Sequence, residues 1–142
     1  FRNSKIGFIF QFHQLLPEFT AIENVCIPGY IKKTNQVDLL KRANELLCYL
    51  DLEKKINNKP SELFGGEQQR VAVARALINN PKIIFADEPS GNLDSTSAKN
   101  LYKLFFDIRE EMVAYDKIRN DKMKIELPQW RELLMRGQLK EI

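Results

Sequence analysis

The sequence has few of the residues that build metal sites or disulfide frameworks. It contains one histidine, His13, and two cysteines, Cys26 and Cys48, whose spacing matches no metal-binding motif. We therefore expect neither a zinc site nor disulfides, and we interpret both thiols as reduced. Long apolar runs are also missing, because stretches such as Ile83 to Ala86 are far shorter than the roughly 20 residues that span a bilayer. The sequence predicts no transmembrane helix.

Charge of one sign is not concentrated anywhere. The 142 residues include 22 basic and 19 acidic side chains, well mixed along the chain, for a net charge of +3. Nucleic-acid-binding proteins usually gather basic residues on one face to contact phosphates, so we expect no nucleic-acid partner. A composition of 44% hydrophobic and 29% charged residues is typical of a soluble globular domain.

Two short apolar runs predict buried strands. They cover Ile6 to Phe10 and Lys82 to Ala86, and both are apolar nearly throughout, as in strands covered on both faces of a parallel sheet. The chain opens at Phe1 without a methionine and runs almost directly into the first strand. We expect the sequence to be a segment of a longer protein.

Helices are predicted between these strands and after the second one. The first begins with a capping box formed by Thr20 and Glu23 and is expected to stop at Pro28-Gly29. Helical periodicity predicts further helices over residues 38–50, 67–78 and 95–112. The order of strand, helical insert, strand and helix indicates an α/β fold.

Residues 113–142 follow a different pattern. Apolar and charged residues alternate around Met123 to Leu127, which predicts a half-buried strand, and Trp130 to Leu134 predict a short helix closed by Gly137. This tail carries no recognisable chemical motif.

Two adjacent carboxylates, Asp87 and Glu88, come directly after the second predicted strand. In open α/β sheets, ligands bind at the carboxyl ends of the strands. In phosphoryl transfer, one carboxylate can hold Mg²⁺ while the next orients or deprotonates the attacking water, and here Asp87 would take the metal and Glu88 the water. The alternative is a surface acidic pair that only favours the following turn.

A glycine pair lies ahead of these carboxylates, within the stretch LFGGEQQRVAVARAL from Leu63 to Leu77. This stretch resembles the signature motif of ABC (ATP-binding cassette) proteins, usually Leu-Ser-Gly-Gly followed by Gln or Glu, and the helix that continues it. Gly65 and Gly66 would let backbone donors approach a phosphate at a helix N-terminus. The resemblance implies that Phe64, Gly65, Gly66 and Glu67 face ATP. The alternative is a glycine loop that starts an ordinary helix.

Two further segments fit the same family in the expected order. Ser90 to Asp94 resembles the D-loop, which lies between two nucleotide-binding subunits, although Asp94 could equally be an N-cap for the next helix. Gln11 ends an apolar strand and matches the glutamine of the Q-loop. The resemblance implies that Gln11 contacts Mg²⁺ and the attacking water and links the site to the membrane partner.

The resemblance covers residues 6–112 and is nearest to the lipoprotein-releasing and macrolide-export branch, in the wording QFHQLLPEFTAIENV and ADEPSGNLDS. It implies a partial P-loop NTPase fold of the ABC type over residues 1–112, with a mainly parallel sheet and a helical subdomain over residues 12–80. ATP and Mg²⁺ are the implied cofactors. A transmembrane permease and a second nucleotide-binding subunit are the implied partners, with the chain peripheral at the cytoplasmic face of the membrane.

Three departures from the family pattern matter. The sequence contains no phosphate-binding Gly-x-x-x-x-Gly-Lys-Ser/Thr. After Met112 there is no strand that ends in a switch histidine, and His13, beside Gln11, cannot fill that role. Phe64 stands where the signature serine would contact the γ-phosphate and cap the helix. These departures leave alternatives to an active ATP hydrolase: a fragment or degenerate relative that only binds the membrane partner, and a soluble non-transport ABC protein.

Overall fold

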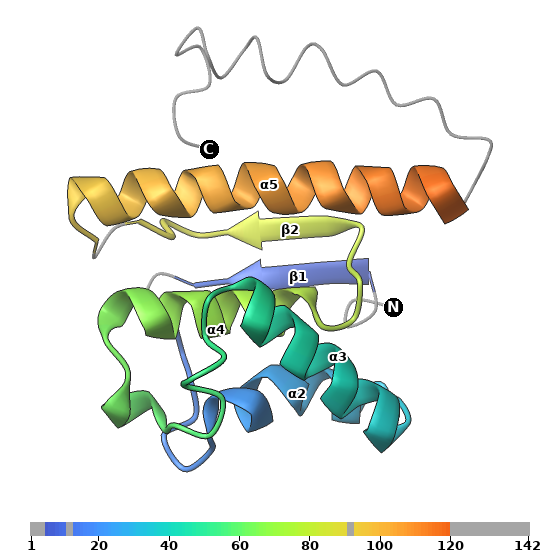
Figure 1. Cartoon of the computed structure of the whole chain (residues 1–142), viewed down its shortest axis with the longest axis horizontal. Coiled ribbons are helices and arrows are strands. Elements are labelled where there is room, and N and C mark those ends of the chain that lie inside the picture. Colours follow the sequence, from blue (N-terminus) through green and yellow to red (C-terminus); the bar gives the residue numbers. More distant parts are fainter. Residues whose placement is uncertain (1–4, 11–12, 91–92, 120–142) are drawn as a thin grey trace, which may run out of the picture. The chain divides into compact units, whose positions relative to one another are not determined.

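A computed structural model describes the backbone of residues 5–10, 13–90 and 93–119, and side chains up to Glu110 in those ranges. The chain divides into two units, residues 1–98 and 99–142, and helix α5 begins in the first and continues into the second. The elements are β1 (Ile6–Ile9), α2 (Ala21–Ile31), α3 (Gln36–Tyr49), the short 3₁₀ helix η1 (Pro60–Glu62), α4 (Gly65–Leu77), β2 (Ile83–Ala86) and α5 (Ser95–Arg119). Figure 1 shows the two strands side by side, with α2, α3 and α4 grouped beside β1.

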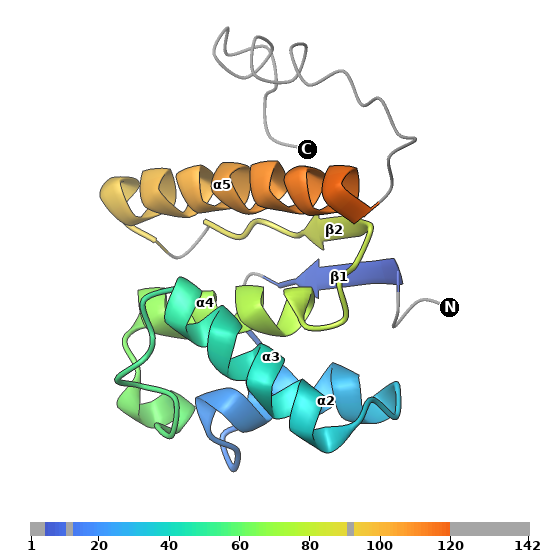
Figure 2. The same cartoon turned by 45° about the vertical axis from the view of Figure 1, so that its right-hand side comes forward.

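β1 and β2 form a parallel pair, as predicted. Ile6 lies opposite Ile83 and Ile9 opposite Ala86. Because both strands run in the same direction, their carboxyl ends meet at one edge of the sheet (Figure 2). The helical insert between them provides the long crossover that a parallel pair requires.

The prediction that both strands are buried is wrong for β2. Ile83 and Phe85 are each 53% exposed, and Phe8 of β1 is also exposed. Within the described residues the sheet has only these two strands. α4 packs against β1, on the face where Gly7 and Ile9 are buried. The Phe8 and Phe85 rings stack across the strands with centroids 5.7 Å apart.

Gly7 permits a close approach between β1 and α4. A β-carbon at this position would lie 2.6 Å from the backbone oxygen of Ala76. Any larger residue would have to push the helix backbone away from the strand. The contact therefore fixes the C-terminal half of α4 against β1.

Helix α2 begins as predicted but does not stop at Pro28. Thr20 and Glu23 form the capping box, and the helix then continues through Pro28 and Gly29 to Ile31. The Pro28 carbonyl still accepts a hydrogen bond from the Lys32 N–H at 3.1 Å, so the helix continues beyond the proline. Gly29 has a packing role, since a β-carbon there would lie 2.1 Å from Cδ1 of the buried Leu39 on α3.

The other predicted helices are present with shifted ends. α3 begins at Gln36, two residues before the predicted start at Asp38, because Asn35 caps it by accepting hydrogen bonds from the N–H groups of Val37 and Asp38. α4 begins at Gly65 rather than Glu67. α5 continues past Met112 to Arg119, so part of the predicted tail is helical. The strand and helix predicted beyond it lie outside the described residues.

A buried asparagine organises the loop before α2. Asn24 accepts a hydrogen bond from the Leu16 N–H and donates to the carbonyls of Leu16, Phe19 and Thr20 at 3.0–3.1 Å. These bonds satisfy its amide inside the core. Both cysteines are free; Cys26 is buried, which raises the pKa of its thiol to about 11, whereas Cys48 is exposed. In the described part of the chain, no helix has the length and hydropathy to cross a membrane.

Candidate functional site

The predicted carboxylates lie at the shared carboxyl edge of the strand pair. The Asp87 N–H donates to the carbonyl of Ile9 at 3.0 Å, which extends the strand pairing by one step. Both Asp87 and Glu88 are exposed at this edge. The parallel register therefore places Asp87 beside the end of β1. Gln11 itself lies outside the described residues.

The backbone of Glu88 adopts an uncommon conformation. Its φ of 40° falls in the left-handed region, which residues with a β-carbon seldom occupy. Strained backbone of this kind tends to persist where the surrounding structure requires it, often at active sites. The conformation turns the chain sharply just after the strand, at the position where a residue that orients water is expected.

Asp94 caps helix α5, which was one of its two predicted roles. Its Oδ2 accepts hydrogen bonds from the N–H groups of Thr96 at 3.0 Å and Ser97 at 3.1 Å. Hydrogen bonds from the Ser97 side chain and backbone lower the pKa of the Asp94 carboxyl. An ionised Asp94 is therefore favoured at this helix N-terminus.

The signature segment forms the open N-terminus of α4. Gly65 and Gly66 are the first two helical residues, and a β-carbon on either would meet no atom within 4 Å. The amide groups of a first helical turn lack intrahelical partners, so they are available to an anion. Glu67 accepts a hydrogen bond from the Phe64 N–H at 2.9 Å, but the Phe64 side chain caps nothing and is 78% exposed.

The structure keeps these residues in two separate groups. Within the described residues, no hydrogen bond joins the first turn of α4 to Asp87 or Glu88, and no three His, Cys, Asp or Glu side chains gather closely enough to hold a metal ion. The carboxylates lie at the sheet edge, and the glycine pair lies at the N-terminus of α4.

Sequence analysis did not single out Arg75, which joins α4 to the loop after β1. Its Nη1 donates to the carbonyl of Gln14 at 2.8 Å and its Nη2 to the carbonyl of His13 at 2.7 Å. No local pattern could have signalled this contact, because the partners lie about sixty residues apart. Burial lowers the pKa of Arg75. Burial also lowers the pKa of His13, as does the Arg75 charge, while the Gln69 amide opposes the shift.

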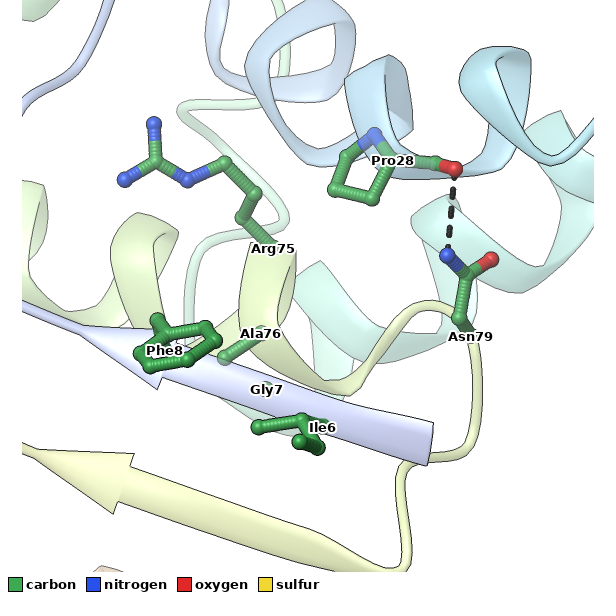
Figure 3. A pocket seen from close by; sticks show the side chains of 7 residues that line it. All are labelled: Ile6, Gly7, Phe8, Pro28, Arg75, Ala76 and Asn79. Carbon is green, nitrogen blue, oxygen red and sulfur yellow. Dashed lines mark hydrogen bonds between the residues drawn. The ribbon is translucent and has the colours of Figure 1, made fainter. Parts of the chain in front are cut away.

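Arg75 also lines a pocket between β1, α2 and the C-terminal end of α4. Figure 3 shows Ala76 beside Gly7 and Phe8 of β1, with the Arg75 side chain extending away from the strand. The Asn79 side chain donates to the Pro28 carbonyl at 3.0 Å across this pocket. The same contact connects the end of α4 to α2.

Comparison with known proteins identifies the family. The ABC transporter family matches residues 1–91, so the chain belongs to the ABC transporter family. The fold agrees, since the ATP-binding cassette MJ0796, solved as a dimer in a post-hydrolysis state bound to ADP and Pi, superposes with a TM-score of 0.67 at 46% identity. That alignment covers 78% of this chain and 49% of the cassette. The predicted ABC-type α/β fold is confirmed.

Two curated relatives that resemble this chain are both ATP-binding proteins of lipoprotein-releasing systems. The lipoprotein-releasing system ATP-binding protein LolD of Cytophaga hutchinsonii is 60% identical over 110 residues, covering 78% of this chain and 50% of the relative. LolD of Bacteroides thetaiotaomicron is 56% identical over 112 residues, covering 79% of this chain and 51% of the relative. The chain thus spans about half the length of the curated relatives it matches. These relatives agree with the predicted branch.

Proposed function

We propose that this chain is part of the ATP-binding subunit of an ABC transporter of the lipoprotein-releasing type. The main support for the proposal is the position of the carboxylate pair Asp87–Glu88. Parallel strand pairing places this pair at the carboxyl edge of an ABC-type sheet. The identity of 56–60% to LolD proteins supports the lipoprotein-releasing branch over a non-transport ABC protein. In this proposal, ATP binding and hydrolysis drive a transmembrane permease, and the subunit sits at the inner face of the membrane.

The proposed catalytic roles follow from the chemistry of the side chains. Mg²⁺ is usually held by one or two carboxylates together with substrate phosphates and water, so a single exposed Asp87 fits its site without an all-protein cage. Glu88 would orient or deprotonate the attacking water, and Gln11 would contact the metal and that water. When bound, Mg²⁺ would neutralise charge on the phosphates.

The proposed role of the α4 N-terminus is to contact nucleotide held by a second subunit. The open amide groups around Gly65 and Gly66 suit a phosphate, with Glu67 and Asp94 at the same subunit interface. Phe64 does not fit this role, because a phenyl ring can neither hydrogen-bond a phosphate nor cap the helix. Phe64 therefore favours a second candidate function, a module that binds the membrane partner without supporting hydrolysis.

The test compares two forms of the complete subunit, one with Phe64 and one with Phe64→Ser. Both carry Glu88→Gln, which slows hydrolysis. A serine would regain the phosphate hydrogen bond, worth about 1.5–3 kcal/mol, so Phe64→Ser should tighten ATP-dependent dimerisation by roughly tenfold or more in sedimentation. Equal dimerisation of the two variants would rule out the two-subunit role of α4.

A hydrolysis assay on the chain itself tests whether these 142 residues support catalysis on their own. We expect negligible steady-state ATP turnover, because the printed sequence has no phosphate-binding loop to hold the γ-phosphate. Turnover typical of the family that Glu88→Gln abolishes would instead reveal a phosphate site that we have not recognised.

A further inference from the structure

The guanidinium of Arg75 holds two consecutive carbonyls of the loop after β1. Its two terminal nitrogens contact His13 and Gln14 at 2.7 and 2.8 Å. Because the guanidinium fork is planar and rigid, two such bonds fix the orientation of the loop as well as its distance from α4. A lysine ammonium is a compact charge and cannot present the same two-point geometry.

The held turn has a backbone that needs support. His13 and Gln14 have φ values of 53° and 47°, both in the left-handed region that residues with a β-carbon rarely occupy. The His13 N–H closes the turn by donating to the Phe10 carbonyl at 3.1 Å. The two bonds from Arg75 act on the outer carbonyls of this strained turn, so they help to keep it in place.

The partial burial of Arg75 points to a specific role rather than to space filling. Taking a guanidinium out of water is unfavourable unless hydrogen bonds compensate for the lost hydration. Burial lowers the pKa of Arg75, and the partners that compensate here are the carbonyls of His13 and Gln14. An apolar residue could fill the same space without that desolvation, but it could not bind the loop.

The next residue in the chain fixes the helix itself. Ala76 carries the backbone oxygen that Gly7 of β1 approaches closely. The C-terminal part of α4 is therefore held against both β1 and the turn that follows it. A helix rises about 1.5 Å per residue, so the first turn of α4 lies roughly 15 Å from Arg75 along one rigid element.

We propose that Arg75 is a positioning residue that holds the His13–Gln14 turn at a fixed place on the signature helix α4. The turn and the N-terminal glycine pair of that helix then move as one body when the subunit binds nucleotide. The inference rests on the proposed function for its consequence, but the contact between Arg75 and the turn can be tested without nucleotide.

The first test uses the chain as it is and measures backbone hydrogen exchange by mass spectrometry. Arg75→Lys keeps the charge but loses the two-point contact. It should therefore speed exchange across residues 13–16 by roughly tenfold or more. The matched control is Arg42→Lys on α3, because Arg42 also bonds across elements, to Asn80, without touching the turn. Unchanged exchange in Arg75→Lys, or the same change in the control, would overturn the proposal.

A second readout keeps the test decisive if Arg75→Lys folds poorly. His13 is the single histidine, so its imidazole gives one assignable NMR signal. The Arg75 charge lowers the pKa of His13. Arg75→Gln removes that charge and should raise the pKa of His13, whereas Arg42→Gln should leave the pKa of His13 unchanged. A His13 pKa that does not respond to Arg75→Gln would show that the two residues are not neighbours.

A third arm in the complete subunit tests the functional consequence. There Arg75→Lys should lower kcat for ATP by roughly tenfold with little change in KM, since positioning of pre-bound groups acts on the chemical step. A raised KM with unchanged kcat would assign Arg75 to nucleotide binding and overturn the positioning role. If the wild-type complete subunit hydrolyses no ATP, the proposed function fails while the exchange and NMR results still decide the contact.

Discussion

The helical region from Leu16 to Asn80 and the strand pair β1–β2 differ in how well their apolar side chains are buried. The helical region has capped helices, a buried asparagine with bonded amide atoms and a core of fully buried side chains such as Val25, Leu47 and Val73. The strand pair has one covered face, and its other face exposes aromatic and aliphatic side chains. The helical region therefore buries a core of its own, whereas the strand pair leaves Phe8, Ile83 and Phe85 exposed.

The largest expected effect is the loss of stability when a core side chain of the helical region is truncated. The same truncation in the strand pair should cost much less. Leu47 is fully buried, so Leu47→Ala should lower the free energy of unfolding by about 2–5 kcal/mol through lost contacts and a cavity. Ile83 is 53% exposed, and Ile83→Ala should cost about 1 kcal/mol or less. Urea unfolding followed by circular dichroism measures both. Equal costs would contradict the difference between the regions.

The next prediction tests the contact between β1 of the strand pair and α4 of the helical region. Gly7→Ala forces a β-carbon to within 2.6 Å of the Ala76 oxygen, and we expect a loss of about 1–3 kcal/mol because backbone must move. Gly66→Ala is the matched control, since nothing lies within 4 Å and alanine is the better helix former. A Gly7→Ala variant as stable as Gly66→Ala would mean that β1 and α4 do not pack so closely.

A smaller gain is expected at α4, the α-helix of the helical region whose first turn has no side-chain cap. Phe64→Ser should add a side-chain cap to α4 and raise the free energy of unfolding by about 1 kcal/mol in the absence of nucleotide. The midpoint of urea unfolding checks this gain, with Phe64→Ala as the control that removes the ring without adding a hydroxyl. Equal midpoints for the serine and alanine variants would exclude capping as the cause.

The smallest effect is a dependence of stability on pH. Burial lowers the pKa of His13 below its ordinary value of 6.5, so the unfolded chain binds a proton more readily than the folded one. This contribution to stability should be complete above pH 6.5 and should be lost as the pH falls through the folded pKa. Unfolding midpoints between pH 7 and 5 should fall less steeply in His13→Gln. The same slope in both proteins would show that His13 is not desolvated.

Local signals predicted the elements that depend on local chemistry. The capping box at Thr20 and the carboxylates after β2 are readable because their partners lie within a few residues. The passage of α2 through Pro28 was missed because Gly29 packing on α3 is a tertiary effect. The exposure of Phe85 was missed because burial depends on what covers a strand, and Arg75 was missed because its partners are distant in the sequence.

The register of the strand pair also sets an order of events in folding. Ile6 pairs with Ile83 across more than seventy residues, so the entropy of closing that loop must be overcome before the pairing contributes to stability. The contacts of α2 with α3 are much more local. We therefore expect the helices to condense first and to shorten the effective loop, so that docking of β2 beside β1 is the slow step by which the sheet edge bearing Asp87 and Glu88 is assembled.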